Sequence, residues 1–214
     1  MTKGTDMAQF PFEVGDRILF QGDSITDCGR REDPFGVGTG YVSMIKGALA
    51  AATRGAAIEI TNRGVSGDRS VELVNRWKED CLDLCPTHVS IMVGVNDIWH
   101  DNVGRGISLA DYEANMRRII ECTISAGIRL ILVTPTTVDG DPSHPYNVKC
   151  GEYAAAVEAF ARKYEAILVP ARDRMWEAVR SGPSVEFYLP DGVHPSVAGH
   201  AVIAAAWLEA AGVM

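Results

Sequence analysis

Four short segments of the chain each place a polar residue close to a glycine. They read Gly22-Asp23-Ser24, Gly64-Val65-Ser66-Gly67-Asp68, Gly94-Val95-Asn96-Asp97 and Asp191-Gly192-Val193-His194. Together they supply a hydroxyl, an imidazole, a carboxylate, a carboxamide and glycine amides. Acyl transfer through a serine needs these parts as a nucleophile, a base, an acid that orients the base, and donors for the oxyanion. The inventory therefore indicates serine-based acyl transfer, provided that the fold brings the four segments together.

The catalytic roles follow from the chemistry of three side chains. A serine hydroxyl such as that of Ser24 is a weak nucleophile and needs an adjacent base. An unperturbed imidazole has a pKa near ~6.5 and is largely neutral at pH 7, so His194 suits that role. Asp191 precedes it by three residues, on what should be one tight turn, where it could hold the imidazole tautomer. We expect Ser24, Asp191 and His194 to be the catalytic residues.

The oxyanion of a tetrahedral intermediate needs hydrogen-bond donors that are fixed in advance. The backbone N–H groups of Ser24 and Gly67 and the side-chain amide of Asn96 could converge on it. The lack of a Cβ at Gly67 would let the backbone approach the substrate closely, whereas Gly64 would serve the turn. We expect Ser24, Gly67 and Asn96 to form the oxyanion hole.

Each of these residues also has an ordinary structural interpretation. Ser24 could cap the helix that follows it, as serine often does. Asp191 stands in an Asp-Gly pair that favours turns, and Asn96 could bond the backbone of its own loop. His194 could be a surface histidine before a helix. The functional interpretation is favoured because all four segments occur in one chain.

Two further residues are candidates for substrate binding. Asp23 precedes the serine, and Trp99 closely follows the third segment. Asp23, like Asp68 and Asp97, has the alternative role of fixing its loop by hydrogen bonds. Trp99 could line a pocket for an acyl group or a sugar, or it could pack beneath a helix.

Strand and helix patterns alternate along the chain. Short apolar runs predict strands at 17–20, 58–61, 89–93, 130–133 and 167–169. Amphipathic segments predict helices at 41–53, 69–82, 108–126, 149–164 and 197–211, with loops at 28–39 and 136–147. Most strand runs are continuously apolar, as in a parallel sheet that is covered on both faces.

These patterns predict a single α/β domain over residues 1–214. The expected architecture is a three-layer α/β/α sandwich, flavodoxin-like, with about five parallel strands. In such sheets, ligands bind outside the carboxyl ends of the strands. The four polar segments follow predicted strands or precede the last helix, so we expect them to meet at that edge.

Composition and charge exclude several classes of protein. The hydrophobic fraction is 47% and the charged fraction 22%, which is ordinary for a globular domain. The net charge of −8 argues against a general nucleic-acid binder. The apolar runs fall far short of the ~20 residues that a membrane helix needs. The five cysteines, Cys28, Cys81, Cys85, Cys122 and Cys150, lack the spacing of a disulfide framework or a zinc site.

Targeting and cofactor signals are also missing from the sequence. Residues 1–17 contain no apolar core of a signal peptide, so we expect a cytoplasmic protein. His100 and Asp101 do not have the spacing of metal ligands. The glycine-rich run 36–40 lacks the G-x-G-x-x-G pattern of dinucleotide binding. We therefore expect no metal and no cofactor.

The four segments resemble those of the SGNH, or GDSL, hydrolase family. That family contributes a serine in Gly-Asp-Ser, a glycine, an asparagine in Gly-x-Asn-Asp and a histidine in Asp-x-x-His. The matching residues are Ser24, Gly67, Asn96 and His194, with Asp191 as the acid. Gly67 is matched because it lies five residues after Asn62, where the family's donor glycine falls. The segments keep the family's order, and Ile25 replaces its usual leucine.

A narrower resemblance is to the intracellular acetylxylan esterases of this family. It rests on the runs 22–30, 38–41, 90–97 and 193–200. The resemblance implies a serine esterase that removes acetyl groups from xylo-oligosaccharides or related sugars through an acyl-enzyme, and that forms a homo-oligomer. The alternatives are a lysophospholipase or thioesterase on the same triad, or a non-catalytic carbohydrate-binding protein.

Overall fold

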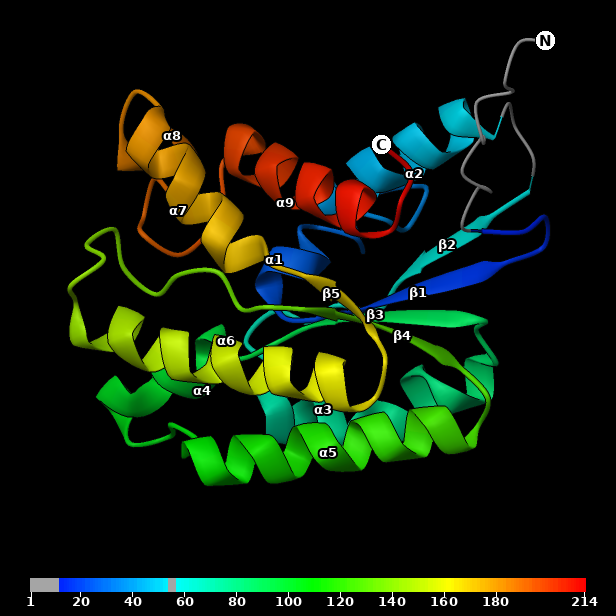
Figure 1. Cartoon of the computed structure of the whole chain (residues 1–214), viewed down its shortest axis with the longest axis horizontal. Helices are drawn as coiled ribbons and strands as arrows, with labels where there is room; N and C mark the ends of the chain where they lie inside the picture. The colour runs from blue at the N-terminus through cyan, green and yellow to red at the C-terminus, as the bar shows by residue number, and fades with distance from the viewer. Residues whose placement is uncertain (1–11, 54–56) are drawn as a thin grey trace, which may run out of the picture.

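A parallel sheet lies at the centre of the molecule (Figure 1). The computed structural model describes residues 12–53 and 57–214, and within them the sheet has five strands in the order β2-β1-β3-β4-β5. The strands are β1 (Arg17–Gly22), β2 (Glu59–Asn62), β3 (His88–Met92), β4 (Arg129–Val133) and β5 (Ile167–Val169). This order is the flavodoxin-like one, with the reversal between β1 and β3. The prediction of a doubly wound parallel sheet is confirmed.

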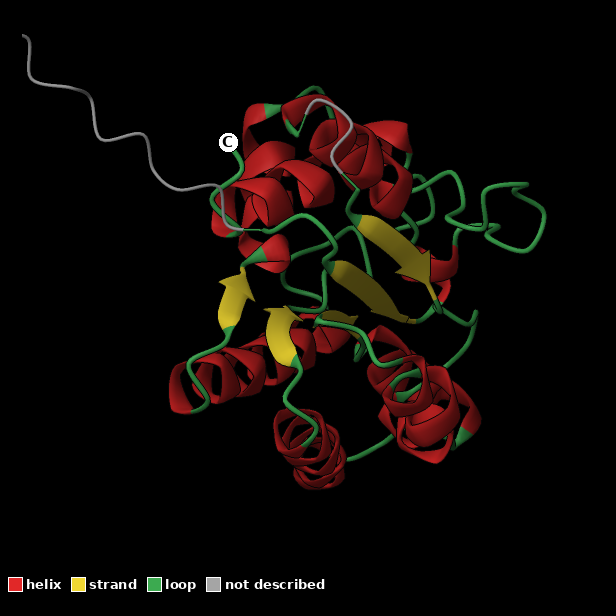
Figure 2. Cartoon of the chain, turned by 90° about the vertical axis from the view of Figure 1, so that its right-hand side faces the viewer, coloured by secondary structure: helices red, strands yellow, loops and turns green. Residues whose placement is uncertain are grey.

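Helices cover both faces of the sheet. They are α1 (Ser24–Asp27), α2 (Tyr41–Ala52), α3 (Ser70–Asp80), α4 (Val95–Trp99), α5 (Leu109–Ser125), α6 (Pro145–Lys163), α7 (Ala171–Ser181), α8 (Val185–Tyr188) and α9 (Val197–Ala210), with the short 3₁₀ turns η1 (Leu82–Leu84) and η2 (His100–Val103). Helices α2, α7, α8 and α9 lie on one side, and α3, α4, α5 and α6 on the other (Figure 1). Figure 2 shows the sheet edge-on between these two helical layers.

The central strand explains the continuous apolar pattern. All five residues of β3 are buried, because neighbouring strands and helices cover both edges and both faces. The polar Ser90 in this strand accepts a hydrogen bond from the Trp207 indole, over 3.1 Å. Trp207 also packs on Phe20 of β1, with ring centroids 5.5 Å apart. These contacts join α9 to the sheet.

The five predicted helices agree with the structure to within a few residues, but α7 and the short helices α4 and α8 were not predicted. Helix α5 begins after Ser108, whose side chain accepts from the Asp111 N–H, as its capping pattern predicts. The loop predicted at 136–147 is shorter, because α6 begins at Pro145 and proline suits the first helical position. Helix α7 was not predicted, and it begins directly after Pro170.

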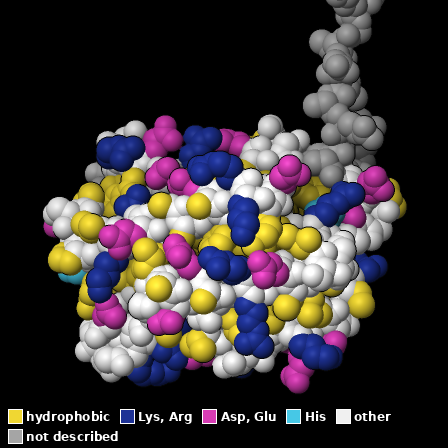
Figure 3. Space-filling model, turned by 60° about the horizontal axis from the view of Figure 1, so that its bottom comes forward, with side chains coloured by type: hydrophobic (Ala, Val, Ile, Leu, Met, Phe, Trp, Pro, Cys, Tyr) yellow, Lys and Arg dark blue, Asp and Glu magenta, His cyan; other side chains and the backbone are white. Residues whose placement is uncertain are grey.

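The surface of the face that carries α5 mixes Lys and Arg with Asp and Glu side chains (Figure 3).

All five cysteines are free thiols. None of the helices in the part of the chain that the structure describes is long and apolar enough to cross a membrane. Residues 1–11, most of the segment in which the sequence shows no signal peptide, lie outside the described residues.

Candidate active site

Ser24 is the first residue of α1, directly beyond the carboxyl end of β1. The cap of this helix is Asp23, whose Oδ1 accepts the N–H of Ile25 over 3.0 Å. The hydroxyl of Ser24 is therefore not used as a helix cap, and that structural interpretation is wrong. Asp23 is only 2% exposed, so its predicted contact with substrate is replaced by a capping role.

The side chains of Ser24, His194 and Asp191 form a continuous hydrogen-bonded chain. The Oγ of Ser24 lies 3.0 Å from Nε2 of His194, although the two residues are 170 positions apart. Nδ1 of His194 lies 2.8 Å from Oδ2 of Asp191. With Nδ1 donating to the carboxylate, Nε2 is free to accept the serine proton. The sequence predicted that these three residues meet, and the structure brings them together.

The backbone of the loop 191–194 fixes the acid of this chain. Oδ1 of Asp191 accepts the N–H groups of Val193, over 2.9 Å, and of His194, over 2.7 Å. Desolvation raises the pKa of Asp191, but the hydrogen bonds from the His194 side chain and from these amides lower it more. The net pKa lies below its usual value, so the carboxylate stays ionised at neutral pH. The side chains of Asp191 and His194 are both more than half exposed, so the site is open to solvent.

The loop between β2 and α3 leaves one amide for a ligand. From Arg63 to Asp68, five of the six backbone N–H groups donate to protein acceptors. The N–H of Gly67 has no acceptor among the described residues. It is therefore free to donate to an oxyanion. The N–H of Ser24, the first amide of α1, is free in the same way.

The structure gives different reasons for glycine at positions 64 and 67. Gly67 has a φ of +85°, and a Cβ added there would meet nothing within 4 Å, so its backbone conformation demands glycine. A Cβ at Gly64 would lie 2.4 Å from the backbone nitrogen of Asp27. Glycine is therefore required at position 64 because the loop packs on α1, and the open space beside Gly67 is compatible with the predicted approach of a substrate to its backbone.

Asn96 lies in the first turn of α4, after β3. Its side-chain amide donates to the backbone carbonyl of Asp68 over 3.0 Å, and the residue is 9% exposed. This hydrogen bond uses one of the two amide hydrogens and leaves the other available to a substrate. The structural interpretation, a bond to loop backbone, and the predicted oxyanion role are therefore compatible.

Two further residues hold the loop 63–68 against α1. The side-chain amide of Asn62 donates to the carbonyls of Thr26, over 2.6 Å, and Val37, over 2.9 Å. Oδ2 of Asp27 accepts both the N–H of Ser66, over 3.2 Å, and its hydroxyl, over 2.8 Å. No spacing rule relates these residues, because they are joined only by the fold.

The other acidic residues of the motifs are structural. Asp97 is fully buried, and its carboxylate accepts the N–H of Ser70 over 3.0 Å and also its hydroxyl. Burial raises the pKa of Asp97 to about 6 and that of Asp23 to about 7. Asp97 thereby joins the start of α3 to the start of α4, which carry Ser70 and Asn96. The prediction that these carboxylates fix loops is confirmed.

Trp99 and His200 differ in their exposure and in their contacts. Trp99 is 39% exposed and meets the ring of Tyr146 edge-on, with centroids 6.3 Å apart, so it stays a candidate for substrate contact. His200 is buried, and its Nδ1 accepts the N–H of Tyr41 over 3.2 Å. Burial lowers the pKa of His200 to about 4. His200 therefore caps the start of α2.

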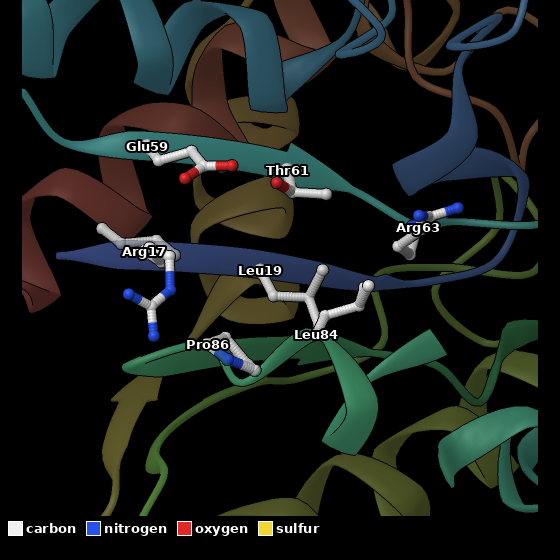
Figure 4. Close-up of a pocket in the computed structure, with 8 residues that line it drawn as sticks. Arg17, Leu19, Glu59, Thr61, Arg63, Leu84 and Pro86 are labelled. Carbon is white, nitrogen blue, oxygen red and sulfur yellow. The ribbon is translucent and has the colours of Figure 1, made fainter. Parts of the chain in front are cut away.

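A separate hollow lies beside β1 and β2, at the β2 side of the sheet (Figure 4). Its lining includes Arg17, Leu19, Glu59, Thr61, Arg63, Leu84 and Pro86. None of the residues of the hydrogen-bonded chain lines it, so it is separate from the candidate active site. Within residues 12–53 and 57–214, no three His, Cys, Asp or Glu residues form a group that could hold a metal ion.

Comparison with known proteins gives a consistent picture. The model of the GDSL-like lipase/acylhydrolase family matches residues 20–202. An acetylxylan esterase from Geobacillus stearothermophilus is 35% identical over 209 residues, which is 92% of this chain and 94% of that protein. The crystal structure of Axe2, an acetylxylan esterase from that organism, superposes with a TM-score of 0.86 at 33% identity, over 92% of this chain and 94% of the other. A catalytic mutant of Axe2 with a serine replaced by alanine superposes with a TM-score of 0.89 at 32% identity, over 95% and 97%.

Proposed function

Since the chain belongs to the GDSL-like lipase/acylhydrolase family, we propose that Ser24, His194 and Asp191 hydrolyse acetyl esters of xylo-oligosaccharides or related sugars. The chain is a carboxylic ester hydrolase, and the relative that is 35% identical to it is an acetylxylan esterase. The observation that carries the proposal is the continuous chain from the serine hydroxyl through the imidazole to the carboxylate.

The mechanism follows from the atoms of this chain. His194 Nε2 takes the proton of Ser24 as Oγ attacks the ester carbonyl, and Asp191 stabilises the imidazolium that forms. The negative charge that develops on the carbonyl oxygen is stabilised by the amides of Ser24 and Gly67 and by the carboxamide of Asn96. His194 then gives its proton to the sugar oxygen. The sugar leaves as an alcohol, and the acetyl group stays on Oγ of Ser24 as an ester.

Hydrolysis of the acyl-enzyme repeats these steps with water. Nε2 of His194 deprotonates a water molecule, which attacks the acetyl carbonyl and displaces Oγ of Ser24. Acetate leaves, and the proton returns to Ser24 through the same imidazole. The exposure of His194 and Asp191 supports this step, because water has free access to the base.

Three features of the proposed biology rest on the sequence and its resemblance. They are a cytoplasmic location, self-association into a homo-oligomer, and an acetylated oligosaccharide rather than a polymer as the substrate. Trp99, exposed beside Tyr146, is the proposed contact for the sugar ring.

The test is acetate release from acetylated xylo-oligosaccharides by the wild type and by Ser24→Ala. Release by the wild type alone supports both the serine mechanism and the sugar-ester class. If neither protein releases acetate while the wild type hydrolyses p-nitrophenyl acetate, the substrate class is wrong. A series of p-nitrophenyl esters then tests the lipid alternative, which requires faster turnover of long acyl chains than of acetyl.

A further inference from the structure

Arg76 of α3 directs its guanidinium inward, beneath the candidate active site. Its side chain is only 16% exposed. Nε donates to Oδ2 of Asp68 over 2.6 Å, and Nη2 donates to the carbonyl of Gly22 over 3.2 Å. Nη1 donates to Oε1 of Gln21 over 2.7 Å and to the carbonyl of Arg63 over 2.8 Å. One side chain therefore binds four other residues from two separate segments.

These partners belong to the two segments that carry the nucleophile and the free amide. Gly22 ends β1, two residues before Ser24. Arg63 and Asp68 are the two ends of the loop that presents Gly67, and Arg63 lies just beyond the carboxyl end of β2 (Figure 4). Arg76 therefore fixes the distance between the nucleophile strand and this loop at three carbonyl or carboxylate oxygens.

The third oxyanion donor is connected to the same residue. Asp68, which accepts from Nε of Arg76, also accepts the side-chain amide of Asn96 at its backbone carbonyl, over 3.0 Å. A displacement of Asp68 would move the acceptor that orients the Asn96 carboxamide. Asn96 is thus two hydrogen bonds from the Arg76 guanidinium, and Ser24 and Gly67 lie within two residues along the chain of an acceptor of Arg76.

An ordinary helix-surface ion pair does not explain this arrangement. Arg76 does approach Asp80, one turn later on α3, at 3.3 Å from Nη1. Such a pair needs only one acceptor and an exposed side chain, and it contributes little to stability. The guanidinium of Arg76 instead satisfies Gln21, which is fully buried, and the largely buried carboxylate of Asp68.

We propose that Arg76 is a positioning residue for the oxyanion hole. It holds the Gly67 loop and the Asn96 carboxamide in a fixed position relative to Ser24. This inference rests on the proposed function. Arg76 does not touch the reacting atoms, and it acts through Asp68, Arg63 and Gly22. Donors to an oxyanion are effective only in a fixed geometry, so loosening this network should slow the chemical step more than it weakens substrate binding.

The test compares Arg76→Ala and Arg76→Lys with the wild type in the hydrolysis of p-nitrophenyl acetate. We expect Arg76→Ala to lower kcat by ~10- to 10²-fold and to change KM by less than about threefold. Arg76→Lys keeps a charged donor group but loses the planar guanidinium with its several N–H groups. Its kcat should therefore lie between those of Arg76→Ala and the wild type. Arg17→Ala is the control, since its guanidinium binds the Cys85 carbonyl at the opposite end of β1 and its loss should leave kcat unchanged.

A double-mutant cycle separates positioning from general damage to the fold. In an Asn96→Ala background, each Arg76 substitution should cost several-fold less in kcat, because one positioned donor is already absent. Thermal melting shows which variants are folded at the assay temperature. If Arg76→Ala is unfolded at that temperature, the test is made with Arg76→Lys. The inference is overturned if the folded variants keep kcat within about twofold, if the loss is confined to KM, or if the same fold-loss occurs in both backgrounds.

The same assay keeps this inference separate from the proposed function. Wild type and Ser24→Ala are measured alongside the Arg76 variants. An active wild type with an inactive Ser24→Ala supports the serine mechanism, whatever the Arg76 variants do. If Ser24→Ala retains activity, the proposed function fails, and the inference about Arg76 fails with it.

Discussion

The side-chain amide of Asn96 donates a hydrogen bond of 3.0 Å to the backbone carbonyl of Asp68. The two residues belong to different strand–helix connections, and they are 28 positions apart. The bond fixes the carboxamide before any substrate arrives. Preorganised donors of this kind lower the barrier because they need no reorganisation as the oxyanion forms.

Replacing Asn96 by alanine should therefore reduce kcat for p-nitrophenyl acetate by on the order of 10²–10³, with a small change in KM. The reason is the loss of a donor that matters in the transition state. Steady-state kinetics of the purified variant measure both constants. Asn102→Ala, an exposed asparagine on η2, is the matched control. A kcat equal to that of the control would show that Asn96 only bonds its loop.

Replacing Asp191 by asparagine should lower kcat by about 10⁴-fold. Asparagine can still accept the amides of Val193 and His194 through one oxygen, so the loop should keep its shape. Its NH₂ group would face Nδ1 of His194, which favours the tautomer that carries its proton on Nε2. That tautomer cannot accept the proton of Ser24. Kinetics together with a melting curve check the expectation, and a well-folded variant with near wild-type kcat would contradict it.

The buried Asp23 makes the stability of the protein depend on pH. Burial raises its pKa from 3.8 to about 7. Between these two values the folded state binds more protons at this site than the unfolded state. The contribution of Asp23 to the free energy of unfolding should therefore fall as pH rises through this range, by at most about 1.4 kcal/mol per pH unit, and level off above it.

The variant Asp23→Asn tests this dependence, because asparagine is also a good helix cap but does not titrate. We expect the stability of the wild type relative to Asp23→Asn to decrease between about pH 5 and pH 7 in urea unfolding experiments. Asp141→Asn is the control. Backbone and side-chain hydrogen bonds from Ser143 lower the pKa of Asp141 below 3.8. The difference in stability between the wild type and Asp141→Asn should therefore stay constant between about pH 5 and pH 7. A constant difference for Asp23→Asn as well would mean that Asp23 stays ionised.

The sequence was sufficient to predict the sheet and the meeting of the triad. Continuous apolar runs identify buried parallel strands, and polar residues at strand ends must gather at one edge of such a sheet. Ser24, Asp191 and His194 could be named because all four polar segments occur together in one chain. Helix α7 was missed because its start at Ala171 has no side-chain cap, and only Pro170 precedes it.

The support of the site could not be predicted in the same way. Arg76 binds Gln21, Gly22 and Asp68 across gaps in the sequence that no helix or strand period relates. Two of the acceptors of Arg76 are backbone carbonyls, of Gly22 and Arg63, which carry no sequence signal at all. The packing of Gly64 on α1 could not be predicted for a similar reason. A positive φ and a close backbone approach both demand glycine, and the sequence alone does not distinguish them.

The most direct measurement is turnover of p-nitrophenyl acetate by Ser24→Ala beside the wild type, with circular dichroism to show that both are folded. The hydroxyl of Ser24 lies 3.0 Å from Nε2 of His194, so its removal should lower kcat by about 10⁴- to 10⁶-fold without unfolding the protein. Undiminished hydrolysis by folded Ser24→Ala would contradict the assignment of Ser24 as the nucleophile.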